Sequence, residues 1–287
     1  MIATVVLMAL GTLSALAAIG PRARDARAQV AAVRAPEADS SVGALERATR
    51  AAPDDAELHF RLALAYGREA VEAGFFRPPV LARRMVSELR RTVTIAPGHV
   101  RAHEELARFH LNAPRILGGG LNRARAEMVL LRTSAPERAL VIGGWIAHHE
   151  GHARAAEQAF RDVVAQYPDS SAAFLGLGHV LRDGERNDEA FAAFARAAAL
   201  KPDNLQALNQ MGFIGATTGT HLEAAETAMR RYIALGGGES SRAAAHRRMG
   251  MIYEKLGKVA QARAEYSRAL ELRSSDSDAR EGLRRLR

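Results

Sequence analysis

A cluster of histidines is the first group of residues whose types and spacing could support chemistry. It consists of His148, His149, Glu150 and His152. His148 and His152 stand four residues apart, a spacing that can ligate zinc when both side chains lie on one helix. Gly151 falls where that helix should turn, the sequence has no His-Glu-x-x-His motif, and no third ligand is indicated. We therefore predict no metal site.

Two glycine runs, 118–120 and 236–238, precede expected helices, so their backbone amides could receive an anion. Arg123 and Arg125 stand near the first run. Neither run has the Lys-Ser/Thr ending of a phosphate-binding loop. We interpret both runs as turns and predict no cofactor.

The chain has no cysteine, which excludes a lipoprotein anchor, disulfides, thiolate metal sites and a cysteine nucleophile. No triplet of serine, histidine and acid stands out from the sequence, and no pair of carboxylates does either. We therefore predict a protein that is not an enzyme, with no catalytic residue and no small-molecule substrate.

The elements that must position any site are clearest in residues 170–202. A first helix face carries large residues and one glycine at three-and-four spacing: Phe174, Leu177, Gly178 and Leu181. A second face carries Ala190, Phe194 and Ala197 and closes at Pro202. Asp183-Gly184 supplies the turn between them. The unit is a helix–turn–helix of about 34 residues.

The order large-x-x-Leu-Gly-x-x-large, then Ala-x-x-x-Phe-x-x-Ala, then Pro, resembles the consensus of the tetratricopeptide repeat (TPR) family. Similar units are expected at 56–97, 100–136, 137–168, 205–236 and 243–274. The unit at 205–236 is the fifth repeat of the array, and we expect Ala224 and Ala228 on its second helix face. A half repeat from Ser40 or Ser41 to Ala51 precedes them, and a polar helix at 276–287 follows. The resemblance implies an all-α, right-handed α-solenoid of antiparallel helix pairs, with about six repeats, over residues 40–287.

Two insertions interrupt this pattern. The first carries Phe75-Phe76 before Pro78-Pro79, an apolar tip that either folds back on the array or contacts a partner or membrane surface. The second insertion, residues 112–120, is similar to an Ala-Pro-Gly-Ile-x-Gly-Gly stretch of some bacterial TPR proteins, with Arg115 where that pattern has glycine. This resemblance implies a bacterial origin.

In the TPR family the first helices line a concave wall, so the resemblance places candidate ligand contacts on them. These contacts are Arg108, Trp145, His148, His179, Arg182, Asn209, Phe213, Arg247 and Met251. Arginines pair with carboxylates and aromatic rings take apolar side chains, which suits an extended peptide with acidic groups. The alternatives are an ordinary solvated wall and, because Gly143-Gly144 leaves the register open, Trp145 as a core residue.

The N-terminal residues 2–19 form an uncharged apolar run about long enough to cross a bilayer. We expect a signal peptide or membrane anchor at 1–28, with cleavage after Ala28 as one outcome, and a linker at 29–39. The protein would then be periplasmic or anchored in the inner membrane through residues 2–19. The positive-inside rule, applied to Arg22, Arg24 and Arg27, gives the alternative of an anchor with the array in the cytoplasm.

The formal charge is +8, and the only lysines are Lys201, Lys255 and Lys258. The arginines are spread over every repeat, which favours a solvated face over a nucleic-acid site. We therefore predict a non-enzymatic scaffold or adaptor that binds a protein or peptide partner in the concave groove, in cell-envelope assembly or secretion. The alternatives are an arginine-rich solenoid that binds nucleic acid or another polyanion, and a membrane-tethered spacer.

Overall fold

The structure is a computed structural model that describes residues 41–72, 78–236 and 238–287. Over these ranges it contains fourteen α-helices, one 3-10 turn and no strand. The helices are α2 (Val42–Ala51), α3 (Ala56–Glu72), α4 (Pro78–Ile95), α5 (Val100–Asn112), α6 (Leu121–Ser134), α7 (Pro136–His149), α8 (Ala153–Gln166), α9 (Ser171–Asp183), α10 (Asn187–Leu200), α11 (Leu205–Thr218), α12 (Leu222–Ala234), α13 (Glu239–Lys255), α14 (Val259–Leu272) and α15 (Ser277–Arg285), with η1 (Arg115–Leu117) between α5 and α6. The predictions for residues 1–39 and for Phe75-Phe76 lie outside the described residues.

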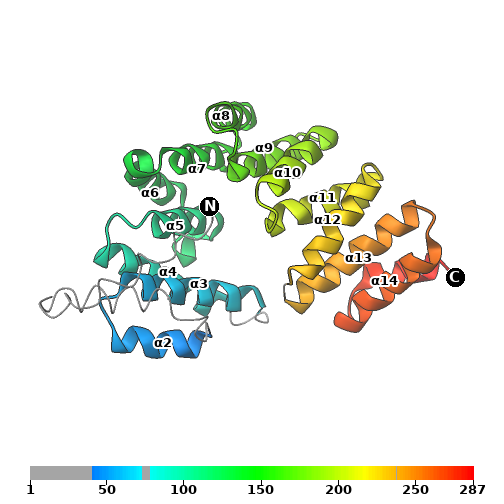
Figure 1. The fold of residues 1–287 in the computed structure, drawn as a ribbon, viewed down its shortest axis with the longest axis horizontal. Coiled ribbons are helices and arrows are strands. Elements are labelled where there is room, and N and C mark those ends of the chain that lie inside the picture. The colour runs from blue at the N-terminus through cyan, green and yellow to red at the C-terminus, as the bar shows by residue number, and fades with distance from the viewer. Residues whose placement is uncertain (1–40, 73–77, 237) are drawn as a thin grey trace, which may run out of the picture.

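The helices pack as consecutive antiparallel pairs along a curved array (Figure 1). The pairs are α3/α4, α5/α6, α7/α8, α9/α10, α11/α12 and α13/α14. Helix α2 packs on α3 at one end, and α15 packs on α13 and α14 at the other. The predicted solenoid of six repeats, a leading half repeat and a capping helix is therefore confirmed. Ser41 caps α2, because its hydroxyl accepts a hydrogen bond from the Ala44 N–H.

Within a repeat, the two helices approach closely where a glycine of the first faces an aromatic ring of the second. A Cβ at Gly178 would lie 2.6 Å from Phe194 Cε1, which is too close for two carbon atoms. Gly144 faces Phe160 and Gly250 faces Tyr266 in the same way. The spacing of glycine and ring that marked the repeats in the sequence therefore has a steric cause.

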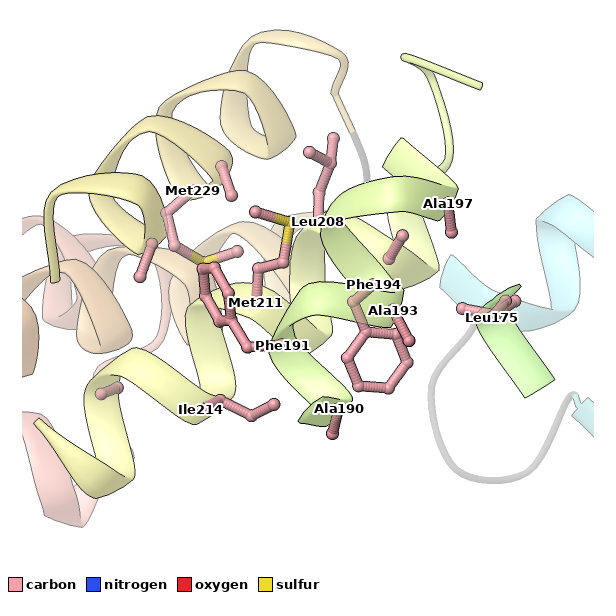
Figure 2. Close-up of a cluster of buried hydrophobic side chains, with 14 of the residues drawn as sticks. Leu175, Ala190, Phe191, Ala193, Phe194, Ala197, Leu208, Met211, Ile214 and Met229 are labelled. Atoms are coloured by element: carbon pink, nitrogen blue, oxygen red, sulfur yellow. The ribbon is translucent and has the colours of Figure 1, made fainter. Parts of the chain in front are cut away.

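Buried side chains from residues 141–279 form one continuous core, with Leu283 and Leu286 packed against it. Figure 2 shows how neighbouring repeats share it: Phe191 of α10 lies beside Met211 of α11 and Met229 of α12. The helices before α7 divide their buried side chains among three smaller clusters. Across the described ranges, none of the helices combines the length and the apolar character needed to cross a membrane.

One helix face of the fifth repeat differs from the prediction. Ala225, not Ala224, is buried in α12, and Ala224 is exposed. The first helix of this repeat, Leu205–Thr218, has 14 residues, whereas Ser171–Asp183 has 13. The extra residue shifts the second helix by one position, so the spacing taken from the fourth repeat identified the wrong alanine.

Three repeats join their helices through a histidine and a glutamate. His59 Nδ1 lies 2.5 Å from Glu88 Oε2, His103 Nδ1 lies 2.6 Å from Glu127 Oε2, and His246 makes the same contact with Glu265 at 2.6 Å. At the equivalent positions the fourth repeat has Phe174 and Ala193, and the fifth has Leu208 and Ala228. The two positions thus hold an ionisable pair in the first, second and sixth repeats and an apolar pair in the fourth and fifth.

Candidate partner-binding groove

The first helices form a shared wall along the array. Each first helix contacts the second helix of its own repeat, and several also contact the next first helix. These additional contacts join α5 to α7, α7 to α9, and α11 to α13. Side chains on this wall therefore come from several repeats at once. This is the arrangement that an extended ligand lying across the repeats would need.

A cavity of about 320 Å³, the Trp145 pocket, opens in this wall between α5, α7, α9 and the start of α11. Its apolar lining is Leu111, Val141, Ile142, Trp145, Ala172 and Leu175. Charged and polar side chains at its rim are Glu104, Arg108, Glu137, Arg138 and Gln206. A mostly apolar cavity with a few polar groups at its edge is the usual form of a ligand site.

Trp145 lies between the core and the pocket. Its ring packs edge-on against Phe160 at 5.4 Å between centroids, against His179 at 5.4 Å and against His148 at 5.6 Å. The register is fixed because Gly144 faces the Phe160 ring from within the repeat, while Gly176 faces the same ring from the next repeat. Trp145 is therefore half-buried: it contacts the core with one side and lines the cavity with the other.

The histidines of the pocket differ in charge environment. Burial, and secondarily the Arg182 guanidinium, lowers the pKa of His179 to about 4, so this ring is neutral at pH 7. His148 Nε2 lies 2.9 Å from Asp183 Oδ2, and its Nδ1 is enclosed without a partner. Burial, and secondarily His148, lowers the pKa of His149. His179 therefore adds no charge to the inner wall of the pocket at pH 7.

The rim carries both charges. Arg138 donates to Glu104, and Arg108 lies 3.6 Å from Glu104 and 3.8 Å from Glu105. The Arg108 side chain remains 57% exposed, so its guanidinium can exchange these weak pairs for a ligand group. The rim can therefore bind both backbone carbonyls and side-chain carboxylates.

The structure brings together four of the residues predicted for the groove: Arg108, Trp145, His148 and His179 all line the Trp145 pocket. Arg182 lies beside it on α9 and donates to Asp183 and to Gln210. The other predicted residues, on α11 and α13, do not line this pocket.

Those other residues differ in how free they are to contact a ligand. Phe213 is 39% exposed and Met251 is half-buried. Asn209 accepts a hydrogen bond from Arg248 at 2.9 Å. Arg247 already has carboxylate partners on the capping helix, since its guanidinium pairs with Asp276 at 3.5 Å and with Asp278. Its prediction as a ligand contact is untested, but these pairs would compete with a ligand.

Sequence reasoning missed several polar residues of this wall, among them Arg138, Gln206 and Arg248. Arg138 and Gln206 each stand six residues before the glycine of their repeat, Gly144 and Gly212, so they occupy one repeat position. Comparison of that position among the repeats could have identified both. Arg248 had no such signal, because its contact with Asn209 depends on how two repeats are rotated against each other.

Glycines of both runs form turns, and two histidines of the cluster, His148 and His149, line the Trp145 pocket. Within residues 41–72, 78–236 and 238–287, no group of three or more His, Cys, Asp or Glu could hold a metal ion. Gly118, Gly120 and Gly236 adopt positive φ angles of 98°, 142° and 88°, which confirms the turn interpretation for them. Arg123 donates to the Gly118 carbonyl oxygen and Arg125 to Glu150.

Comparisons with known proteins agree with this architecture. Models of the tetratricopeptide repeat match residues 149–204 and 243–276. Among solved structures, pilF of Pseudomonas aeruginosa is similar with a TM-score of 0.51 and 16% identity, over 79% of this chain and 95% of that chain. YrrB, a TPR protein with an unusual peptide-binding site, aligns with a TM-score of 0.44 and 14% identity, over 85% of this chain and 100% of that chain. No curated protein matches the sequence.

Proposed function

We propose, on the premise of a solenoid that contains TPR repeats, that the chain is a non-enzymatic scaffold that binds a segment of a partner protein along its inner wall. The observation that carries this proposal is the Trp145 pocket. Its volume of about 320 Å³ is at the lower end for ligand sites, which suits one large side chain with its adjoining backbone.

The pocket has the features of a binding hot spot. Hot spots combine a buried aromatic or arginine residue with a rim that excludes water. Here Trp145, Leu175 and the neutral His179 offer an apolar surface, while Arg108 and Arg138 stand at the rim. An aliphatic or aromatic side chain of the partner would enter the cavity, and the rim would bind the flanking peptide groups.

The first experiment uses Trp145 as its own reporter, because it is the only tryptophan of the chain. Peptides selected from a random library on the full chain should share a large apolar residue and should change the emission of Trp145. Measured by anisotropy of a labelled peptide, Trp145→Ala should weaken binding by roughly tenfold or more, the loss of about 1.4 kcal/mol or more of apolar contact.

Two further variants control this result. Ala172 is exposed at the pocket, so Ala172→Phe should fill the cavity and weaken binding without disturbing the core. Leu130 is 57% exposed on the second helix α6, so Leu130→Ala should leave affinity unchanged. Selected peptides that bind all these variants equally and leave the Trp145 emission unchanged would refute the proposal.

The cellular site is a separate part of the proposal. We place the protein in the bacterial cell envelope, in an assembly or secretion process, with residues 2–19 as its export signal or membrane anchor; support comes from the apolar run alone. Mass spectrometry of the N-terminus after expression in a bacterial host, with fractionation, tests this. An intact N-terminus in the soluble cytoplasmic fraction would contradict it.

The main alternative, binding of nucleic acid or another polyanion, differs in its response to salt. Phosphate contacts release counterions, so affinity would fall steeply between 50 and 200 mM salt. An apolar anchor in the Trp145 pocket should make binding much less sensitive. Titration of a selected peptide and of a DNA oligonucleotide at several salt concentrations separates the two.

A further inference from the structure

Arg248 is a cation in the inner wall that has no countercharge among the residues that the structure describes. Its Nη1 donates to the Asn209 side-chain oxygen at 2.9 Å, which links α13 to α11. The described part of the chain offers this guanidinium no carboxylate partner, and an amide oxygen accepts a hydrogen bond without neutralising the charge. Arg248 is thus half-buried and electrostatically unpaired.

The neighbouring charges do not compensate for it. Arg247, next in the chain, holds Asp276 and Asp278, the acidic residues at the start of α15. Glu265 on α14 contacts His246 instead. Burial, and secondarily Arg247, lowers the pKa of the Arg248 guanidinium, which shows that its surroundings disfavour the positive charge.

The Arg248 side chain has intermediate exposure, and it stands on α13, a first helix in contact with the first helix α11 that carries Asn209. A free guanidinium edge can bind a carboxylate through two parallel hydrogen bonds, and this pairing strengthens when water is displaced.

We propose that Arg248, positioned by Asn209, is an anion subsite that binds the carboxylate of an acidic residue in the partner segment. This inference rests on the proposed function: the apolar side chain of the segment would occupy the Trp145 pocket, and an aspartate or glutamate farther along the same segment would reach Arg248 between the fifth and sixth repeats. The two subsites fix the register of the segment on the array.

The test is a parallel selection of random peptides on the full chain and on three variants. Arg248→Met removes the charge and keeps much of the side chain. Asn209→Asp supplies a carboxylate at the atom that now contacts Arg248, so it occupies the subsite from within even if Arg248→Met folds poorly. Arg263→Met is the matched control, since Arg263 is an exposed arginine on the second helix α14.

Peptides selected on the unmodified chain and on Arg263→Met should carry Asp or Glu at a fixed distance from their apolar anchor. This acidic preference should disappear on Arg248→Met and on Asn209→Asp. Replacing the acidic residue of a selected peptide by its amide should weaken binding at least tenfold on the unmodified chain and by less than twofold on Arg248→Met.

Three refuting outcomes are distinguishable. Peptides that keep the apolar anchor and change Trp145 emission, but show no acidic preference or keep it on both subsite variants, would overturn the Arg248 subsite and leave the proposed function standing. A selection that yields no peptide sensitive to Trp145 would overturn both. A preference for the free C-terminal carboxylate over an internal acid would also overturn the assignment to an acidic side chain.

Discussion

Removal of the glutamate from the His103–Glu127 pair should cost far more stability than removal of the whole pair. The two side chains are only 7% and 16% exposed, and His103 Nδ1 lies 2.6 Å from the carboxylate. In Glu127→Ala the imidazole stays in place, because its Nε2 remains 2.8 Å from the Pro97 carbonyl oxygen. One ring nitrogen is then left without a partner inside the protein.

The magnitude follows from the burial of the pair. Loss of a hydrogen bond to a charged group, with the partner left unsatisfied, costs about 2 to 3 kcal/mol. The double variant His103→Leu with Glu127→Ala copies the apolar pair Leu208 and Ala228 of the fifth repeat. Replacing both partners by apolar groups is often neutral, so we expect stability within about 1 kcal/mol of the original.

Thermal unfolding of the full chain, followed by circular dichroism, measures both effects. For a chain of this size about 1 kcal/mol shifts Tm by roughly 3 °C, so Glu127→Ala should lower Tm by about 6 to 9 °C. The double variant should recover most of this loss. Glu271→Ala, which breaks the exposed pair with Arg268, is the control and should change Tm by less than about 2 °C.

A double variant as unstable as Glu127→Ala would refute the reasoning, because the cost would then come from lost packing volume. An unchanged Tm in Glu127→Ala would refute it as well, since the carboxylate would then contribute nothing to the fold.

Three further predictions concern other contacts of the array. Gly178→Ala should destabilise the chain by about 1 to 2 kcal/mol by pressing on Phe194, and Phe194→Leu in the same chain should restore part of the loss in urea unfolding. His179 has a folded pKa of about 4, below its ordinary 6.5, so the unfolded chain takes up the proton first as pH falls. The contribution of His179 to the free energy of unfolding is complete above pH ~7 and should fall by about 2 kcal/mol by pH 5. Urea titrations at both pH values should show this loss in the original chain and not in His179→Asn. Arg247→Ala should release α15, because the cap loses its ion pairs with that arginine. The backbone amides of α15 should then exchange with deuterium at least about tenfold faster.

The opposite results are equally specific. A stabilised Gly178→Ala would mean that the helices separate without cost. Equal losses between pH 7 and pH 5 in the original chain and in His179→Asn would assign the pH dependence to other groups. Unchanged exchange in α15 after Arg247→Ala would mean that packing alone holds the cap.

The repeat register was predictable from sequence because it has a steric origin. A glycine must face each ring, so Gly178 with Phe194 and Gly250 with Tyr266 set the phase of their repeats. The same rule resolves the register around Trp145. The error at Ala224 arose because one added residue in the preceding helix does not alter the local pattern of apolar residues.

The groove was only partly predictable. Position within the repeat predicts which residues lie on the first helices, and it placed Trp145 and His179 on one wall. It does not predict which of them already have partners. The pairing of Arg247 with Asp278 and of Arg248 with Asn209 depends on the rotation between successive repeats, which no local pattern encodes.

The uneven division of the core has a consequence for synthesis. The three small clusters belong to the helices that leave the ribosome first, whereas the continuous core of residues 141–279 is complete only when α15 has emerged. Domains fold during translation as their contacts become available. Each repeat contacts only its neighbours, so we expect the three small clusters to pack once α7 has emerged, while the core of residues 141–279 extends repeat by repeat.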